Sequence, residues 1–324
     1  MSGVGGVDVL HIGDHPDPIP KDDELLVHVR ATALNRADLL QRRGKYPPPE
    51  GASGILGLEM AGEIGEVGSA VEGAKPGDRV FALLPGGGYA QKAVVPSGMA
   101  MRIPEGLSYE EAAAIPEAFL TAHHNLFSLG DLQPGMTVLV HAGASGVGTA
   151  AIQLIREAGA ACLVTAGSPE KIARCRELGA QAAWNYHQGS FAPWVAEKTG
   201  ERGVDVVLDC IGAPYIGPNL ASLATDGRLI VLGVLGGAVA ERVNLLDLLF
   251  RRLRILGTSL RSLDAARKVE LTRRFAGFAL PRFADGRLRP VIDSVYDWTD
   301  VASAHLRMES NVNVGKIVLR VGGL

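Results

Sequence analysis

The sequence predicts an α/β protein with a doubly wound parallel sheet and a second, irregular β-rich domain. From Pro134 onward, apolar strands alternate with helical stretches, and this alternation is typical of a parallel sheet covered by helices on both faces. Between residues 24 and 116 the strands are short and the turns are frequent, which indicates the β-rich domain. At 324 residues the chain is long enough for both.

Four short strands are expected in the β-rich domain, at residues 25–31, 61–67, 79–82 and 89–95, with a helical segment over 39–43. After a helix over about 263–279, the chain passes Pro281 and Pro290 and returns to short β-type pieces that end in 316–321. We therefore expect the tail to rejoin the first domain. One domain would comprise residues 1–116 and 262–324, and the other residues 117–261.

The strands expected in the second domain cover 137–140, 161–166, 183–184, 204–209, 228–232 and 255–258. The first of them runs directly into the small-residue loop 141–148, and the stretch 149–159 that follows has apolar residues at helical spacing. Strand, tight turn and helix in this order are what a dinucleotide-binding loop requires.

The loop matches most of the G-x-G-x-x-G pattern. Gly143 can make the turn without steric cost, Ser145 occupies the second glycine position, and Gly148 lets the helix lie close to the sheet. The amino end of the helix would then face a pyrophosphate. A nucleophile elbow, G-x-S-x-G, fits less well because the final glycine falls one position early.

The residues after the second strand of this domain indicate which nucleotide binds. A carboxylate that accepts hydrogen bonds from both ribose hydroxyls would normally stand here, but the chain reads Gly167-Ser168-Pro169-Glu170-Lys171. Ser168 and Lys171 can instead serve a 2′-phosphate, and we expect Glu170 to point away on the helix. The alternative is that Ser168 only caps the helix and Lys171 is solvated. The sequence favours NADPH.

Composition narrows the class of protein. With 47% hydrophobic and 21% charged residues, no long apolar run and no signal-peptide pattern, we expect a cytoplasmic protein that does not enter a membrane. Cys162, Cys175 and Cys210 form no C-x-x-C pair, so neither a disulfide framework nor a zinc ribbon is supported. A net charge of −3 argues against nucleic-acid binding, although residues 242–290 hold twelve Arg or Lys against four acids.

Three polar residues of the first domain fall within one helix-and-turn unit and are candidates for a substrate site. Asn35 and Asp38 lie three positions apart, so a helical turn aligns them, and Tyr46 offers a phenolic donor with an aromatic face. The alternatives are a helix cap for Asn35 and a salt bridge to Arg42 for Asp38.

We expect no metal site. His123 and His124 are adjacent, which puts them on different helix faces, and no cysteine lies near them. His141, at the end of a strand, is expected to be a hydrogen-bonded structural residue rather than a catalyst.

Several segments resemble one family nearly end to end, at residues 33–39, 82–88, 114–118, 141–154 and 315–319. Through these motifs the chain resembles the zinc-free quinone oxidoreductases of the medium-chain dehydrogenase/reductase superfamily, which are related to zeta-crystallin. The resemblance is greatest to the branch that contains the tumour-suppressor-inducible NADPH:quinone oxidoreductases. It implies a GroES-like catalytic domain, a Rossmann cofactor domain, and a homodimer or dimer of dimers.

The resemblance places the zinc ligands of the alcohol dehydrogenases at Asn35, Leu58 and Glu117, and none of these is a cysteine or histidine. Without a Lewis acid, alcohol dehydrogenation is not expected. An acceptor that is already electrophilic is expected instead. A quinone fits because hydride addition gives a stabilised aromatic anion, and an alkene conjugated to a carbonyl fits nearly as well.

The family also implies roles for individual positions. Around the cofactor, these are Thr121, Gly233, Val234 and Ser259 at the nicotinamide, Ser145, Gly146, Val147 and Gly148 at the pyrophosphate, Ser168, Lys171 and Tyr186 at the adenosine phosphate, and Cys210 to Gly212 at the ribose. Asn313 and Lys316 would reach the phosphates from the tail. Asn35, Asp38 and Tyr46 would form the substrate wall, with Tyr46 orienting or protonating the reduced quinone.

Two features depart from the family. Only Met1-Ser2-Gly3-Val4 precede Gly5-Gly6, so the first strand of the relatives is expected to be missing or replaced. The polar pair His124-Asn125 follows Thr121, and the sequence gives no account of its effect.

Three functions remain open. The first is NADPH-dependent quinone reduction, by hydride transfer or by one-electron steps. The second is reduction of an activated C=C bond in an enone, alkenal or enoyl thioester, with Arg251, Arg252 and Arg254 attracting a carrier. The third is a protein that holds NADPH without turnover or binds RNA. The intact glycine loop makes the third the weakest.

Overall fold

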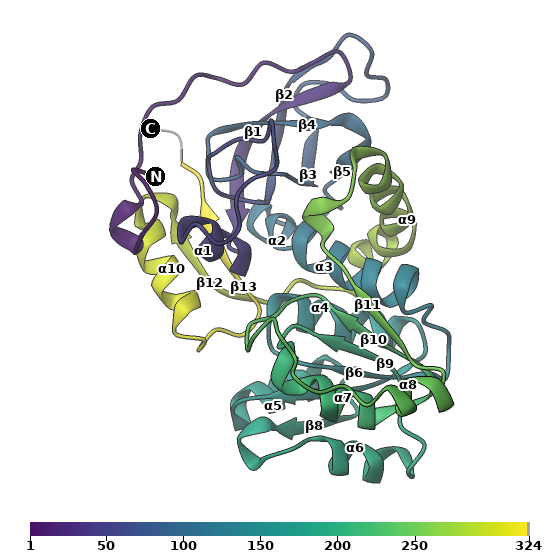
Figure 1. Ribbon diagram of the computed structural model, residues 1–324. Helices are drawn as coiled ribbons and strands as arrows, with labels where there is room; N and C mark the ends of the chain where they lie inside the picture. The colour runs from purple at the N-terminus through teal and green to yellow at the C-terminus, as the bar shows by residue number, and fades with distance from the viewer. Residues whose placement is uncertain (323–324) are drawn as a thin grey trace. The chain divides into compact units, whose positions relative to one another are not determined.

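The computed structural model describes residues 1–322, and the chain divides into two compact units (Figure 1). Unit 1 comprises Met1–Leu120 and Arg261–Leu324, and unit 2 comprises Thr121–Leu260. No helix in the described part of the chain is long and apolar enough to cross a membrane.

Unit 1 is built on a seven-stranded sheet. Its strands are β1 (Glu24–Ala33), β2 (Glu59–Val67), β3 (Arg79–Leu83), β4 (Lys92–Pro96), β5 (Ala100–Arg102), β12 (Ile292–Asp297) and β13 (Lys316–Arg320). The main path runs β12-β13-β1-β2-β3-β5, and β4 pairs with β1 off this path. Every pair is antiparallel except β12 with β13. The C-terminal strand β13 therefore lies directly beside the first strand β1.

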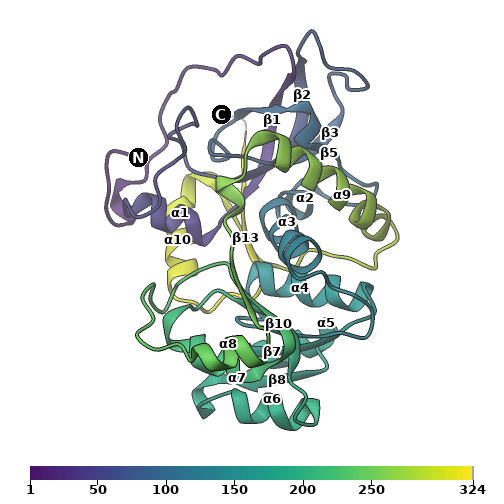
Figure 2. The same ribbon diagram turned by 45° about the vertical axis from the view of Figure 1, so that its right-hand side comes forward.

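The helices of unit 1 surround this sheet. They are α1 (Arg36–Arg42), α2 (Tyr109–Ala113), α9 (Ala265–Ala284), α10 (Val301–Glu309) and the first part of α3 (Pro116–His123). Figure 2 shows α9 running beside the part of the sheet that carries β3 and β5. On its inner face, the ring of Phe283 lies 5.0 Å from that of Phe119 on α3.

Helix α9 is longer than predicted, because it continues through Pro281 to Ala284. A proline inside a helix loses one N–H hydrogen bond to the residue four positions earlier. Here that bond lies in the last turn, and the Asp285 N–H closes the helix on the Pro281 carbonyl at 3.1 Å. The buried rings of Phe275 and Phe283 hold this turn against the core.

The amino terminus contains no strand before Glu24. It forms a 3₁₀ helix over Val7–Val9, and the Gly5 N–H donates to the Arg42 carbonyl at 3.1 Å. The Nε of Arg42 donates back to the Gly5 carbonyl at 3.2 Å. The short amino terminus therefore packs on the end of α1.

Unit 2 contains a six-stranded sheet in which every pair is parallel. Its strands are β6 (Thr137–Val140), β7 (Ala161–Ala166), β8 (Ala182–Asn185), β9 (Val204–Asp209), β10 (Leu223–Val231) and β11 (Arg254–Gly257). The order is β11-β10-β9-β6-β7-β8, so the winding direction reverses between β6 and β9. In open α/β sheets, ligands bind beyond the carboxyl ends of the strands at such a switch point.

Helices cover both faces of this sheet. They are α4 (Gly146–Glu157), α5 (Pro169–Leu178), α6 (Ala192–Thr199), α7 (Ile216–Ser222) and α8 (Leu245–Phe250). Figure 1 shows α4 on one side of the strands, and α6 and α7 on the other. Alternate strand residues such as Leu139, Val207 and Leu229 form a core with Phe191 and Leu220 from the α6 and α7 side. The architecture is the predicted α/β fold with a doubly wound parallel sheet.

Candidate active site

The loop between β6 and α4 has the geometry of a phosphate cradle. Ser145 is the N-cap of α4, and its hydroxyl oxygen accepts a hydrogen bond from the Gly148 N–H at 3.0 Å. A Cβ atom on Gly148 would lie 2.6 Å from the Gly143 carbonyl oxygen, so only glycine lets the first turn approach the loop this closely. The N–H groups of Gly146 and Val147 start the helix, where no intrahelical acceptor exists. This arrangement fits a pyrophosphate.

The turn itself differs from the prediction in one respect. The backbone enters the left-handed region at Ala142, with φ of 52°, and not at Gly143. Gly143 is required for a different reason, because a Cβ there would lie 2.8 Å from Val164 and 3.1 Å from the Cys175 sulfur. The glycine therefore lets the loop pack against β7 and α5.

The loop after β7 brings together Ser168, Lys171 and Tyr186. Ser168 is the N-cap of α5 and accepts a hydrogen bond from the Lys171 N–H at 3.3 Å. A Cβ atom on Gly167 would lie 2.6 Å from the Tyr186 ring, so the tyrosine lies over this loop. Glu170 is exposed, and a hydrogen bond with the Ser168 side chain lowers the pKa of its carboxyl group.

The loops after β9 and β10 bring Cys210, Gly212, Gly233 and Val234 together. The Leu235 N–H donates to the Cys210 carbonyl at 3.1 Å, and Gly212, with φ of 86°, forms a parallel bridge with Gly237. Cys210 is half-buried, and Val234 is exposed. These loops stand at the carboxyl ends of adjacent strands, which is where the cofactor is expected.

Thr121 and Ser259 stand elsewhere in unit 2. Ser259 is exposed after β11, and Thr121 lies in α3. The Thr121 carbonyl accepts a hydrogen bond from the Asn125 side-chain Nδ2 at 2.7 Å, where a π-helix over His124–Leu129 follows α3. Asn125 is buried, so this half of the unusual polar pair ties the π-helix to α3.

Unit 1 contains a buried polar cluster around Lys316, at the beginning of β13. The Lys316 ammonium lies 2.7 Å from Glu59 Oε1 and donates to Asn35 Oδ1 at 2.6 Å and to the Leu34 carbonyl at 2.7 Å. The Asn35 Nδ2 donates to Glu59 Oε1 at 2.7 Å. Lys316 is 4% exposed and Glu59 is 0% exposed, so this ion pair is removed from water.

These contacts change what can be expected of the tail residues. The three protons of the Lys316 ammonium match three acceptors within unit 1. Asn313, the other tail residue, donates from Nδ2 to the Gly315 carbonyl at 3.0 Å. We therefore leave both residues out of the proposed cofactor site.

Asp38 belongs to the same cluster and is completely buried. Its carboxylate accepts hydrogen bonds from the Asn35 N–H at 2.8 Å, the Gly57 N–H at 3.2 Å and the Tyr89 hydroxyl at 3.1 Å. Burial raises its pKa to about 6 against the lowering effect of these bonds. The alternative of a salt bridge to Arg42 is wrong, because Arg42 pairs with Glu309.

Glu117 is a member of this site that the sequence did not single out as reactive. Its backbone N–H donates to Glu59 Oε2 at 2.8 Å, which places it at the amino end of α3 beside the cluster. Burial and the negative charge of Glu59 raise its pKa to about 8. The side chain is half-buried, so a carboxyl group that holds its proton at neutral pH borders the cluster.

Tyr46 is half-buried in the turn after α1. The guanidinium of Arg261 lies 5.0 Å from the centre of its ring. Arg261 in turn donates to Gln41 Oε1 at 2.8 Å and to the Pro85 carbonyl at 2.9 Å. A cation on one face therefore fixes the ring of Tyr46.

The residues of this cluster do not fit a zinc ion. Leu58 has no donor atom, and the Asn35 amide is held by Glu59 and Lys316. A buried ammonium group already balances the Glu59 carboxylate. Among residues 1–322, no group of three His, Cys, Asp or Glu side chains is arranged to hold a metal ion.

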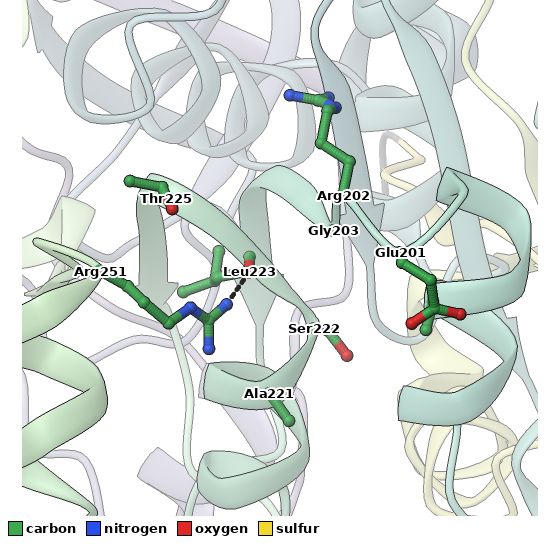
Figure 3. A pocket seen from close by; sticks show the side chains of 9 residues that line it. Glu201, Arg202, Gly203, Ala221, Ser222, Leu223, Thr225 and Arg251 are labelled. Carbon is green, nitrogen blue, oxygen red and sulfur yellow. Dashed lines mark hydrogen bonds between the residues drawn. The ribbon is translucent and has the colours of Figure 1, made fainter.

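A separate cavity of about 320 Å³ lies at the amino ends of the parallel strands, where β9 and β10 begin (Figure 3). Its arginines are both engaged, Arg202 with Asp205 and Arg251 with the carbonyls of Leu220 and Leu223. The glycine loop and the loops after β7, β9 and β10 stand at the carboxyl ends of the strands, so this cavity does not belong to the candidate site.

Comparisons with known proteins agree with this geometry. Residues 21–105 match the family described as alcohol dehydrogenase GroES-like domain, and residues 146–275 match the family described as zinc-binding dehydrogenase. The human synaptic vesicle membrane protein VAT-1 homolog is 32% identical over 99% of this chain and 86% of its own length. The rat quinone oxidoreductase is 31% identical over 97% of this chain and 94% of its own length.

Solved structures give the same answer. The Escherichia coli quinone oxidoreductase complexed with NADPH superposes with a TM-score of 0.87, at 28% identity and with 98% of each chain covered. The overall fold is thus that of a known oxidoreductase. The chain belongs to the medium-chain dehydrogenase/reductase superfamily.

Proposed function

We propose that this protein reduces quinones with NADPH, by hydride transfer or one-electron steps and without zinc. The observation that carries the proposal is the cradle of Gly143, Ser145 and Gly148 at the amino end of α4. A relative of similar fold, the Escherichia coli quinone oxidoreductase, has been solved with NADPH. When bound, NADPH supplies the hydride. The proposal keeps the homodimer and the cytoplasmic location expected from the sequence.

The residues that would hold NADPH stand on the segments at the carboxyl ends of the strands, except Thr121, which lies on α3. The set comprises Ser145, Gly146, Val147 and Gly148 for the pyrophosphate, Ser168, Lys171 and Tyr186 for the 2′-phosphate, Cys210 and Gly212 for the ribose, and Thr121, Gly233, Val234 and Ser259 for the nicotinamide. Lys171 supplies the positive charge of this set, and the neighbouring carboxylate of Glu170, which is not part of the set, opposes that charge. Cofactor preference therefore depends on their balance.

The polar cluster of unit 1 supports an acceptor that needs no Lewis acid. Asn35 and Asp38 are engaged in internal hydrogen bonds, so we propose that they stabilise the substrate wall rather than react. Tyr46 would orient the quinone and donate a proton to the reduced product. Glu117, whose pKa is raised to about 8, is a carboxyl group of unit 1 that keeps its proton at neutral pH.

The test is steady-state oxidation of NADPH and NADH by the purified protein with four acceptors: an ortho-quinone, a para-quinone, an alkenal and an enoyl thioester. Fast quinone reduction with a strong preference for NADPH is expected. A preference for either alkene would replace the quinone by an activated C=C bond. Tight NADPH binding without turnover would contradict both quinone reduction and reduction of an activated C=C bond.

A matched pair of variants on α5 tests the cofactor preference. Lys171→Ala removes the charge proposed for the 2′-phosphate, whereas Arg174→Ala removes a charge of the same sign that pairs with Glu177 on the surface. We expect the first to raise the KM for NADPH about tenfold, which corresponds to one lost charge-assisted contact, and to leave that for NADH unchanged. The second variant should change neither.

A further inference from the structure

A chain of buried side chains in unit 2 joins the ends of β6, β7 and β9. The Nε2 of His141 lies 2.7 Å from Asn219 Oδ1, and its Nδ1 lies 2.9 Å from the Thr165 hydroxyl. Asn219 Nδ2 donates to Asp209 Oδ2 at 3.0 Å. All four residues are at most 3% exposed.

The direction of every hydrogen bond in this chain follows from its last member. The Asp209 carboxylate accepts from the N–H groups of Ile211 at 2.7 Å and Gly212 at 3.2 Å, and in its ionised form it has no proton to donate, so it accepts from Asn219 as well. The Asn219 amide must then present its oxygen to His141. His141 must donate from Nε2, and its bare Nδ1 must accept from Thr165.

The histidine is held in this neutral form by its surroundings. Its ring lies 4.6 Å from that of Phe191 and 4.8 Å from that of Tyr215, and burial lowers its pKa to about 4. A second proton on Nδ1 would face the Thr165 hydroxyl in an apolar pocket. One tautomer therefore satisfies every partner.

These four hydrogen-bonded side chains are connected to the loops of the candidate cofactor site. The Gly143 N–H donates to the carbonyl of Thr165 at 2.9 Å, which ties the glycine loop to one end of the chain. At the other end, Asp209 accepts hydrogen bonds from the N–H groups of Ile211 and Gly212, which belong to the loop after β9. The Gly236 N–H donates to the Ile211 carbonyl at 2.8 Å, so the loop after β10 depends on this segment.

We propose that Thr165, His141, Asn219 and Asp209 form a one-directional hydrogen-bond relay that positions the cofactor loops of unit 2. They are positioning residues, since none is proposed to touch the cofactor. The relay stands on the structure alone. Its consequence for NADPH affinity rests on the proposed function.

The first experiment reads the tautomer of His141 by NMR of protein carrying ¹⁵N-labelled histidine, with the His141 signals identified by their loss in His141→Gln. In the wild type, the proton should reside on Nε2. In Asp209→Asn the new amide must donate to Asn219, which turns over and donates to Nε2, so the ring proton should move to Nδ1. A proton on Nδ1 in the wild type, or the same tautomer in both proteins, overturns the relay.

The second experiment measures NADPH binding by fluorescence titration. Asn219→Leu removes the partner of His141 Nε2 and leaves Asp209 Oδ2 with only the Gly212 N–H at 3.2 Å, and we expect the Kd to rise about tenfold. The control is Ser222→Ala on the same helix, whose buried hydroxyl donates to the Pro218 carbonyl at 2.8 Å and touches no loop of the site. Ser222→Ala should lower the Tm without changing the Kd for NADPH. Equal Kd values for Asn219→Leu and the wild type would overturn the positioning role.

These readouts separate the two proposals. If the wild type does not bind NADPH, the proposed function fails, while the tautomer measurement still tests the relay. If Asn219→Leu does not fold, Asp209→Asn replaces it in the titration. Because that variant keeps every group paired but removes the charge that holds the Ile211 and Gly212 N–H groups, its Kd should rise by a smaller factor, and no rise would contradict the positioning role.

Discussion

Lys316 provides a buried positive charge that pairs with Glu59 and holds Asn35. Removal of one partner of a buried ion pair leaves an uncompensated charge, which is far more costly than the net contribution of the pair. The stability of unit 1 should therefore depend strongly on this residue.

Lys316→Met should lower the free energy of unfolding by about 3–5 kcal/mol at pH 7, measured by urea denaturation. The control is Arg320→Met on the same strand, which breaks an exposed pair with Glu110 and should cost about 1 kcal/mol or less. Similar losses in the two variants would show that the buried pair does not hold the cluster.

Glu117 should make stability depend on pH. Its pKa is raised from the ordinary value of 4.5 to about 8 in the folded chain, so the folded state binds the extra proton. The contribution is fully present below about pH 4.5 and is lost as the pH rises through about 8.

Glu117→Gln keeps the backbone N–H that donates to Glu59, and its side chain cannot ionise. The variant should therefore gain stability relative to the wild type as the pH rises from about 4.5 to about 8, as followed by urea denaturation at each pH. A difference that does not change with pH would mean that Glu117 is ionised throughout.

The strands of unit 2 were the elements most accurately predicted from the sequence. Three of them, Thr137–Val140, Ala161–Ala166 and Val204–Asp209, have the predicted bounds, because each is an apolar run closed by turn residues. Strand β10 begins at Leu223, and the prediction began it at residue 228. The prediction was too late because Asp226-Gly227 has the composition of a turn, although it lies within the strand. A register shift between Leu223 and Arg228 accommodates it.

The loop before α4 gives a prediction at the level of this element. Gly148→Ala would place a methyl group 2.6 Å from the Gly143 carbonyl, and overpacking of this kind costs about 1–3 kcal/mol. The Tm by scanning calorimetry should fall accordingly. Gly277→Ala on α9 meets nothing within 4 Å and should instead stabilise by up to about 1 kcal/mol. No fall in Gly148→Ala would mean that α4 does not need the close approach.

At the scale of the whole molecule, the fold was predictable and the polar cluster was not. Strand alternation and the glycine loop are local patterns, and local patterns determine the class of sheet. The cluster joins Asn35, Glu59, Glu117 and Lys316, which are far apart in the sequence, and nothing in their spacing brings them together. Of these, only Asn35 was predicted at the substrate site, and Lys316 was expected at the phosphates.

The surface of unit 2 supports the proposed dimer. Helix α8 exposes Leu245, Leu246, Leu249 and Phe250 by 60% or more, and the neighbouring strand β11 is an edge of the sheet. An exposed edge with apolar side chains is suited to antiparallel pairing with a second copy.

Light scattering after size-exclusion chromatography should therefore give twice the 34.0 kDa mass of the chain. Phe250→Glu should yield the monomer. Leu306→Glu, which places the same charge on an exposed leucine of α10, should remain a dimer. A monomeric wild type would contradict the dimer, and a dimeric Phe250→Glu would place the interface elsewhere.

The position of β13 beside β1 imposes an order on biosynthesis. Unit 2 is continuous in sequence and can fold as soon as it leaves the ribosome, whereas the sheet of unit 1 lacks a strand until residues 316–320 are made. That strand also brings Lys316. Until Lys316 has been made, the Glu59 carboxylate lacks this ammonium partner, so the nascent chain completes the polar cluster and the sheet of unit 1 in the same step.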